Sequence, residues 1–236
     1  MTGATSTKPS IARAGQPHVS VDVAIFSIVD EQLQVLLVQR DARDSAFAGR
    51  WALPGGLVQT REDADLASCA RRHLRSKAGI DSPHLEQVGT WGDARRDPRG
   101  WTVTTLYFAL VRQDVAPRAG GNSSDVRWHS VDRLPALAFD HADLLQKALE
   151  RLRSKVEYSV LPVFLMPARF TLPELQRAFE TVLGRKLDHS AFRTRMVNAD
   201  VLVATDELRR ETKRPSQLYR VKPGADLLLD SMFRKR

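Results

Sequence analysis

One segment, residues 51–80, constrains the fold of this chain more than any other part of the sequence. It begins Trp-Ala-Leu-Pro-Gly-Gly-Leu-Val, so a short apolar stretch runs into a pair of glycines that permits a tight turn. An amphipathic helical pattern follows over residues 63–78, and Gly79 stands where a helix commonly ends. A strand, a turn and a helix in this order predict a domain in which helices pack on a sheet.

The same segment resembles the Nudix box, whose pattern is G-x5-E-x7-R-E-U-x-E-E-x-G-U, with U an aliphatic residue. Its arginine, aliphatic and closing positions are filled here by Arg72, Leu74, Gly79 and Ile80. Its last three glutamate positions are filled by His73, Ser76 and Lys77. The spacing from Gly56 to Gly79 is also two residues longer than in the motif. The frame of the motif is present, and its metal-binding acids are replaced.

These replacements bear directly on chemistry. Cleavage of a nucleoside diphosphate linkage needs a divalent metal, and Mg²⁺ prefers carboxylate and water ligands. Acids spaced three and four positions apart share one helix face, but here that face carries an imidazole, a hydroxyl and an ammonium group. Glu62, Asp63 and Asp65 precede the helix or lie in its first turn, where they complement the helix dipole. We therefore expect neither catalytic residues nor a metal site.

Size and composition narrow the class of protein. A chain of 236 residues suggests two domains, and its net charge of +8 with a pI near 10.0 favours an anionic partner without identifying it. The single cysteine, Cys69, excludes a disulfide framework. No apolar stretch approaches the roughly 18 residues that span a bilayer, and residues 1–17 lack the apolar region of a signal peptide. We expect a cytoplasmic protein with a disordered arm over residues 1–17 and no membrane partner.

The hydrophobic pattern divides residues 18–156 into alternating strands and helices. We expect strands at Val19–Val29, Gln34–Arg40, Leu85–Asp93, Thr102–Val111 and Val126–Ser130, and a closing helix at Phe139–Val156. Together with the helix at 63–78, these elements predict an α/β chain that opens with a Nudix-like α/β/α sandwich.

The pattern changes over residues 157–223. Thr171 is a good N-cap with Glu174 three positions on, which is a capping box, and Gly184 ends the helix that follows. A second helix starts after Asp188, and extended stretches follow at 201–204 and 217–221. Two helices followed by a β-hairpin predict a winged helix-turn-helix domain, with residues 224–236 as a C-terminal tail. Residues 157–222 hold 12 Lys and Arg against 8 Asp and Glu, so this part is more basic per residue than the first.

Taken together, the chain resembles the Nudix-related transcriptional regulator family, the NrtR-type repressors of NAD metabolism. The most specific motifs are the altered Nudix box, Ala-Phe-Asp-His at 138–141, the Phe-Thr-Leu-x-Glu-Leu opening at 170, and Arg-Pro-Ser-Gln-Leu-Tyr at 214–219. The family usually has arginine and alanine where this chain has Lys213 and Ser216. The resemblance implies a homodimeric repressor that binds double-stranded DNA at a palindromic operator. It implies ADP-ribose or a related nucleotide as effector, with no cofactor required, although related members respond to sugar-derived ligands.

Candidate effector-binding residues cluster in the first domain. Guanidinium groups bind phosphate in bidentate fashion, and a tryptophan ring can stack on a purine. The resemblance adds Asp140 and His141 as a pocket edge. The candidate set is Arg40, Arg50, Trp51, Gly55, Gly56, Arg95, Arg96, Arg99, Asp140 and His141. An arginine at any of these positions can equally be a solvated charge, and a tryptophan is more often part of a core.

Candidate DNA-binding residues lie on the second helix and the wing of the second domain. Arg193 suits guanine and Asn198 suits adenine in the major groove, while basic residues at the helix entry and in the wing suit phosphates. The candidate set is Arg185, Lys186, His189, Ser190, Arg193, Arg195, Asn198, Arg209, Arg210, Lys213 and Arg214. Two alternatives stay open: a Mg²⁺-dependent Nudix hydrolase of ADP-ribose, and an RNA-binding protein. The acid-poor helix speaks against the first, and the lack of an aromatic stacking signature speaks against the second.

Overall fold

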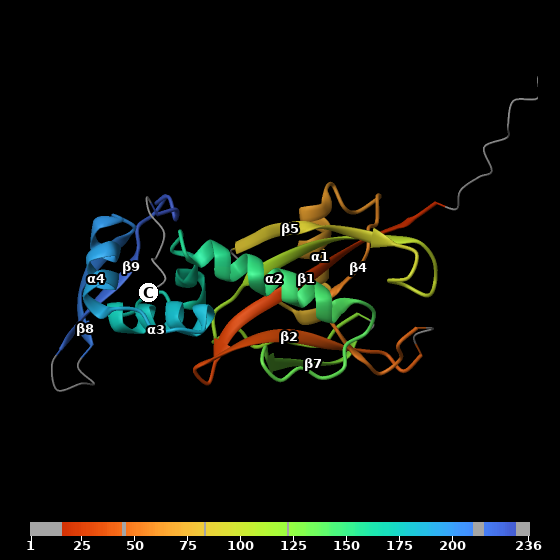
Figure 1. Ribbon diagram of the computed structural model, residues 1–236, viewed down its shortest axis with the longest axis horizontal. Coiled ribbons are helices and arrows are strands. Elements are labelled where there is room, and N and C mark those ends of the chain that lie inside the picture. Colours follow the sequence, from red (N-terminus) through yellow and green to blue (C-terminus); the bar gives the residue numbers. More distant parts are fainter. Residues whose placement is uncertain (1–15, 44–45, 83, 122, 210–214, 230–236) are drawn as a thin grey trace, which may run out of the picture.

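The computed structural model describes residues 16–43, 46–82, 84–121, 123–209 and 215–229. They form two parts along the long axis of the molecule, a sheet with helices on both faces and a smaller helical part with a β-hairpin (Figure 1). The arm expected over residues 1–17 lies almost wholly outside this description. Among the described residues, no helix is long and apolar enough to cross a membrane.

A seven-stranded mixed sheet forms the centre of the first part. Its strands are β1 (His18–Val29), β2 (Gln32–Arg40), β3 (Trp51–Ala52), β4 (Gly55–Leu57), β5 (His84–Asp93), β6 (Thr102–Leu110) and β7 (Ser123–Ser130). The order is β3-β2-β1-β6-β5, with β4 paired to β1 and β7 to β2; β1 and β6 run parallel. The strand expected before the glycine pair is present as β3, but Gly55 and Gly56, which were expected to form a turn, lie in strand β4. Strand β7 begins three residues earlier than expected.

Helices cover both faces of this sheet. Val21, Val23 and Ile25 of β1 pack with α1 (Leu66–Ala78), whereas the alternate residues Ala24 and Phe26 pack with α2 (His141–Val156). Successive residues of a strand point to opposite faces, so α1 and α2 lie on opposite sides. The predicted sandwich is confirmed.

The helix expected over 63–78 begins later, at Leu66. Asp65 is its N-cap and accepts a hydrogen bond from Ser68 N at 2.6 Å, while Ser68 Oγ accepts from Asp65 N at 2.9 Å. Asp63 therefore stays outside the helix, where it accepts from Gln59 N at 2.8 Å. It thus precedes the helix, as one of the two expected placements has it, and its carboxylate also binds Arg72.

The second part has the order of a winged helix. It contains the 3-10 helix η1 (Leu161–Leu165), α3 (Leu172–Leu183), α4 (His189–Asn198) and the antiparallel hairpin of β8 (Leu202–Arg209) and β9 (Ser216–Val221). The capping box of Thr171 and Glu174 is confirmed, and Gly184 ends α3 with φ +68°. Strand β8 is longer than the extended stretch expected at 201–204, because pairing with β9 continues to Arg209.

The two parts pack against each other through helices. α2 contacts α3 and η1, and residues of both parts belong to one continuous apolar cluster. The described portion of the tail, 224–229, returns to the end of α2, where Val160 N donates to Leu227 O and Leu229 N to Tyr158 O, both at 2.8 Å.

Candidate functional site

A pocket of about 470 Å³ lies at one end of the sheet in the first part. Several elements converge on it: β1, β2, β4, α1, the segment between β5 and β6, and the start of α2. Of the predicted effector residues, it is lined by Arg40, Gly55, Gly56, Arg96, Arg99 and His141. Residues that are distant in the sequence are thus brought together, and the guanidinium groups of three predicted residues, Arg40, Arg96 and Arg99, lie around one cavity.

The other predicted effector residues lie outside the lining. The Trp51 ring packs edge-on against His129 with centroids 4.7 Å apart, and Arg50 and Arg95 are exposed. Asp140 does not line the pocket, but its carboxylate accepts hydrogen bonds from Arg96, which does.

A buried polar network forms the floor of the pocket. Arg96 donates to Asp140 and also lies 3.6 Å from Asp22, whose carboxylate accepts a hydrogen bond from Thr104 at 2.8 Å. Leu53 N donates to His141 Nδ1 at 2.9 Å, so the proton of the neutral imidazole is on Nε2, which lies 3.6 Å from Asp22 Oδ1. Burial lowers the pKa of His141. The network holds Arg96 in a fixed orientation at the pocket.

Sequence reasoning missed Asp22. It is a lone acid in the middle of an apolar strand, and its side chain is 8% exposed. A single charged residue within an apolar strand could have indicated a buried site, because a buried carboxylate requires hydrogen-bond or charge partners.

Helix α1 contributes a second wall that was also absent from the predicted site. The pocket is lined by Arg72, His73, Ser76 and Lys77. The face of α1 on which the metal-binding glutamates of the Nudix box are replaced therefore points into the cavity. Arg72 binds Asp63 through two 2.7 Å hydrogen bonds, and these bonds hold the pKa of Asp63 well below its usual range. Burial lowers the pKa of His73 to about 4, with Lys77 and Arg72 adding to the effect.

Arginines also pack on an aromatic ring at the pocket. Phe139 lines the cavity with φ +54°, and the guanidinium carbons of Arg40 and Arg99 lie 4.9 Å and 5.5 Å from its ring centroid. Arg99 also forms an ion pair with Asp97 at 2.7 Å. Within the described ranges, no group of three or more His, Cys, Asp or Glu residues could hold a metal ion.

Helix α4 presents a polar surface beside the hairpin. Phe192 and Met196 are buried, so the opposite face is exposed; it carries His189, Ser190, Arg193 and Asn198. Arg195 differs from these, because it is partly buried and burial lowers its pKa.

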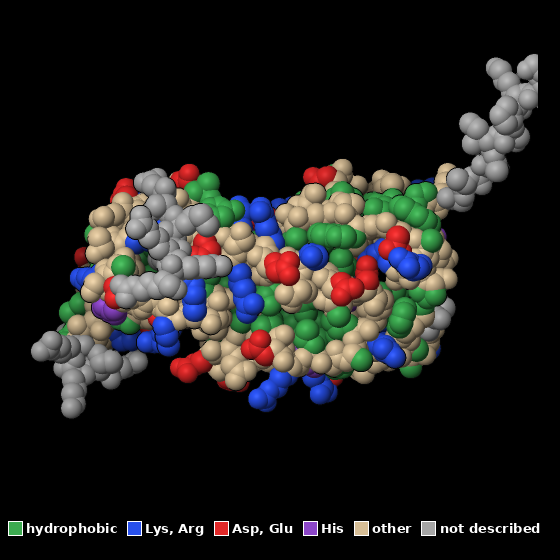
Figure 2. Space-filling view, viewed as in Figure 1, with side chains coloured by type: hydrophobic (Ala, Val, Ile, Leu, Met, Phe, Trp, Pro, Cys, Tyr) green, Lys and Arg blue, Asp and Glu red, His purple; other side chains and the backbone are tan. Residues whose placement is uncertain are grey.

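The remaining DNA-binding candidates have other surroundings. Arg185 pairs with Glu157 and Lys186 with Glu180, each at 2.9 Å, and Arg209 pairs with Glu174. Arg210, Lys213 and Arg214 lie outside the described residues. Basic and acidic side chains are interspersed over the face shown in Figure 2, so charge alone does not single out an interface there.

Comparison with known protein families matches both parts of the chain. Residues 18–151 match the NUDIX domain, and residues 162–221 match the NrtR DNA-binding winged helix domain. The chain belongs to the NrtR family of Nudix-related regulators. It is 48% identical over 206 residues to the ADPR responsive transcriptional repressor NtrR of Acinetobacter baylyi, covering 86% of this chain and 82% of that protein.

Solved structures of NrtR family members agree with this assignment. Shewanella oneidensis NrtR in complex with a 27mer DNA has a TM-score of 0.83 and 39% identity, over 92% of this chain and 99% of that one. The NUDIX domain of the same protein in complex with ADP ribose has a TM-score of 0.54 and 38% identity, over 62% of this chain and 94% of that one.

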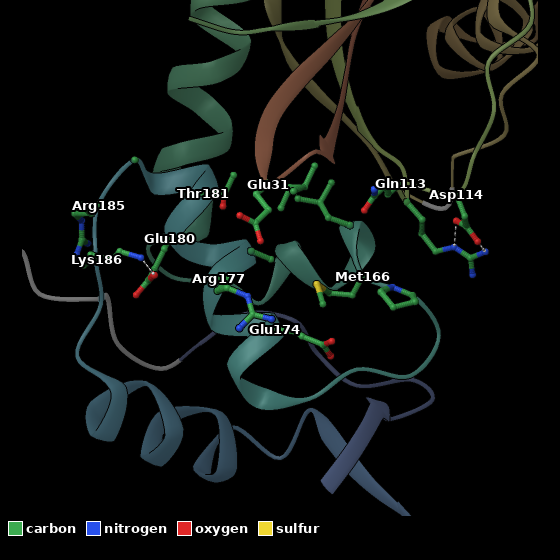
Figure 3. Close-up of a pocket in the computed structure, with 16 residues that line it drawn as sticks. Glu31, Gln113, Asp114, Met166, Glu174, Arg177, Glu180, Thr181, Arg185 and Lys186 are labelled. Carbon is green, nitrogen blue, oxygen red and sulfur yellow. Dashed lines mark hydrogen bonds and ion pairs between the residues drawn. The ribbon is translucent and has the colours of Figure 1, made fainter. Parts of the chain in front are cut away.

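This NrtR family member also has a larger groove where its two parts meet, with a volume of about 900 Å³ (Figure 3). Glu31 points into it from the β1–β2 turn, opposite Arg177 and Thr181 of α3. Its charges are mixed, and pairs such as Lys186 with Glu180 and Arg112 with Asp114 are satisfied within its walls. It therefore lacks the excess of positive charge that distinguishes the pocket in the NUDIX domain.

Proposed function

We propose that this protein is a DNA-binding transcriptional repressor of NAD biosynthesis or salvage genes, controlled by ADP-ribose or a related NAD-derived nucleotide. One observation carries the proposal: a pocket with Arg40, Arg96 and Arg99 in its walls lies in a NUDIX domain joined to a winged helix. Guanidinium groups suit a diphosphate, and an exposed polar helix face suits the major groove.

DNA reading is assigned to the exposed face of α4. Arg193 and Asn198 would contact base edges there, and Lys186 would contact a phosphate. We further propose a homodimer that acts in the cytoplasm on a palindromic operator, with half-sites about one helical turn, or a multiple of it, apart. The similarity to Shewanella oneidensis NrtR, which was solved in complex with a 27mer DNA, supports the proposed binding to double-stranded DNA.

The effector would act by binding two states of the protein with different affinity, because only a difference in affinity shifts an equilibrium. α2 is the element through which it would act, since this helix begins at the pocket network and packs on α3. The relative solved with ADP ribose in its NUDIX domain supports the choice of effector.

The proposal is tested by fluorescence anisotropy with promoter fragments of NAD-metabolism genes, with and without ADP-ribose or NAD. We expect saturable binding of a palindromic fragment that ADP-ribose changes at least about tenfold, equivalent to about 1.4 kcal/mol of coupling. Binding that ignores both nucleotides would contradict effector control, and equal binding of scrambled DNA would contradict operator recognition.

The pocket is proposed to bind its nucleotide without cleaving it. The face of α1 that would carry metal-binding acids holds His73, Ser76 and Lys77. Incubation of ADP-ribose with the protein and Mg²⁺ or Mn²⁺ should release no AMP or ribose phosphate above background. Turnover that a chelator abolishes would instead support a hydrolase.

A further inference from the structure

We propose that the α1 positions at which a Nudix hydrolase carries metal-binding glutamates form a direct diphosphate-binding site here, with Lys77 as its cation, so that effector binding requires no divalent metal. This inference rests on the proposed function and deepens it. It concerns residues 73, 76 and 77.

The geometry of α1 places these three side chains in one cavity. Residues three and four positions apart share a helix face, and His73, Ser76 and Lys77 all line the pocket. Arg96 and Arg99 line it from the segment between β5 and β6. A ligand in the cavity therefore has cationic donors on two walls. A divalent ion would meet the same cations and be repelled.

His73 lines the cavity and carries a buried nitrogen without a hydrogen-bond partner in the described part of the chain. The residue is 5% exposed, and its Nδ1 is buried with no hydrogen-bond partner among the described residues. Its Nε2 lies 3.4 Å from the carbonyl oxygen of Leu57, which can only accept, so the proton belongs on Nε2 and Nδ1 is an acceptor. Leaving a buried acceptor unsatisfied is costly.

The ring of His73 lies close to the backbone of a glycine in β4. A Cβ atom on Gly56 would lie 2.8 Å from His73 Cε1, so a larger residue in strand β4 would require the imidazole to shift. Gly56 also has φ +157°, a conformation that other residues rarely adopt. Strand β4 and the His73 ring therefore meet closely at the wall of the pocket.

Lys77 lies at the edge of the cavity against a glycine loop. A Cβ atom on Gly121 would lie 3.9 Å from Lys77 Cγ, and one on Gly120 would lie 2.4 Å from Ser76 O. Gly121 and Ser123 line the same pocket, and Arg118 N donates to Ala78 O at 2.8 Å. The loop thus packs on the last turn of α1 and contributes to the pocket lining next to Lys77.

A simpler role for Lys77 is to complement the negative end of the α1 dipole. Arg75 lies in the same last turn and serves that role equally, but it pairs with Asp81 at 2.7 Å and does not line the pocket. Arg75→Met is therefore the matched control for Lys77→Met, because each variant removes one charge from the same helix turn.

The test is calorimetric titration of the full chain with ADP-ribose, in chelator-treated buffer and again with Mg²⁺. We expect the dissociation constants in the two buffers to agree within about twofold. Lys77→Met should weaken binding by roughly 10- to 100-fold in both buffers, the loss of a charged hydrogen bond. Arg75→Met should leave the affinity unchanged, and Lys77→Arg should retain most of it. Thermal melts of each variant separate loss of binding from loss of folding.

Three results would overturn the inference. Binding that appears only with Mg²⁺ would sink it and leave the proposed effector standing. An unchanged affinity in folded Lys77→Met, or an equal loss in Arg75→Met, would remove the specific role of Lys77. Absence of ADP-ribose binding in both buffers would overturn the effector assignment together with this inference.

Discussion

Arg96 and Asp140 are joined by two parallel hydrogen bonds, from Nε to Oδ2 at 3.0 Å and from Nη2 to Oδ1 at 2.9 Å. Asp140 is the N-cap residue of α2, yet its side chain makes no capping hydrogen bond. The guanidinium that faces the proposed effector pocket thus binds the start of the helix that packs on the winged helix domain. A ligand that draws Arg96 toward itself would act directly on α2.

The first prediction concerns this pair. Asp140→Asn should lower the free energy of unfolding by about 2–3 kcal/mol, because the Arg96 side chain, which is 6% exposed, keeps its charge and loses its bidentate partner. It should also reduce the effect of ADP-ribose on DNA affinity. Asp143→Asn removes an exposed acid from the first turn of the same helix and should cost less than about 1 kcal/mol. Denaturant unfolding and anisotropy measure the two effects, and equal losses in both variants would contradict the prediction.

The second prediction separates two arginines of α4. Arg193 is exposed, so Arg193→Ala should weaken operator binding by about 1–3 kcal/mol and relax specificity at one base pair, with little change in stability. Arg195 is partly buried, and burial lowers its pKa, so Arg195→Ala should act mainly on stability. Anisotropy with single-base operator variants, beside thermal melts, distinguishes these results. Unchanged specificity in Arg193→Ala would exclude base contact by this residue.

Local signals in the sequence predicted local structure well. The capping box of Thr171 and Glu174 and the left-handed Gly184 each depend on neighbours a few positions away, and both are confirmed. The paired glycines at 55 and 56 predicted a turn, but both lie in strand β4, whose pairing with β1 the sequence did not reveal. Strands of two and three residues are too short to show a periodic pattern.

The pocket could be predicted only in part, for a physical reason. Asp22 and Thr104 meet because β1 and β6 pair in parallel, and their contact spans 82 positions, which no local pattern encodes. The arginines of the pocket were predicted because guanidinium groups suit phosphate, but four of the ten predicted effector-binding residues do not line the pocket. Lys77 was missed because the altered motif was interpreted as a loss of metal ligands. The orientation of α1 shows that the same face still points into the cavity.

The third prediction is a pH dependence of stability. Burial lowers the pKa of His73 from 6.5 to about 4, with Lys77 and Arg72 adding to the shift. The unfolded chain therefore binds a proton at His73 below about pH 6.5, whereas the folded chain does so only below about pH 4. Stability from this residue is present above pH 6.5 and is lost as the pH falls toward 4.

Between about pH 7.5 and about pH 5, the loss attributable to His73 is about 2 kcal/mol. His73→Gln keeps a polar side chain of similar size that does not titrate. Between the same two pH values, the free energy of unfolding of this variant should therefore fall by about 2 kcal/mol less than that of the unsubstituted protein. Other histidines and the carboxylates are common to both proteins and cancel in the difference. Denaturant unfolding at the two pH values measures it, and parallel pH profiles would rule out the assignment to His73.

The last prediction concerns a core substitution in the winged helix domain that abolishes DNA binding and leaves ADP-ribose binding intact. Phe192 is 1% exposed and meets Phe179 edge-on with ring centroids 5.2 Å apart, so this contact holds α4 on α3. Phe192→Ala should cost about 3–5 kcal/mol and abolish operator binding. Val197→Ala removes an exposed side chain from the same helix and should cost less than about 0.5 kcal/mol.

ADP-ribose affinity should survive Phe192→Ala, because none of the residues that line the effector pocket belongs to α3, α4 or the hairpin. The apolar cluster is nevertheless continuous from the sheet through α2 to Met196, so cooperative unfolding of the whole chain is the competing outcome. Calorimetry with ADP-ribose and anisotropy with operator DNA on the same preparation decide between them. Loss of both activities together would mean that the two domains fold as one unit, whereas retained ADP-ribose binding places the cooperative boundary between α2 and α4.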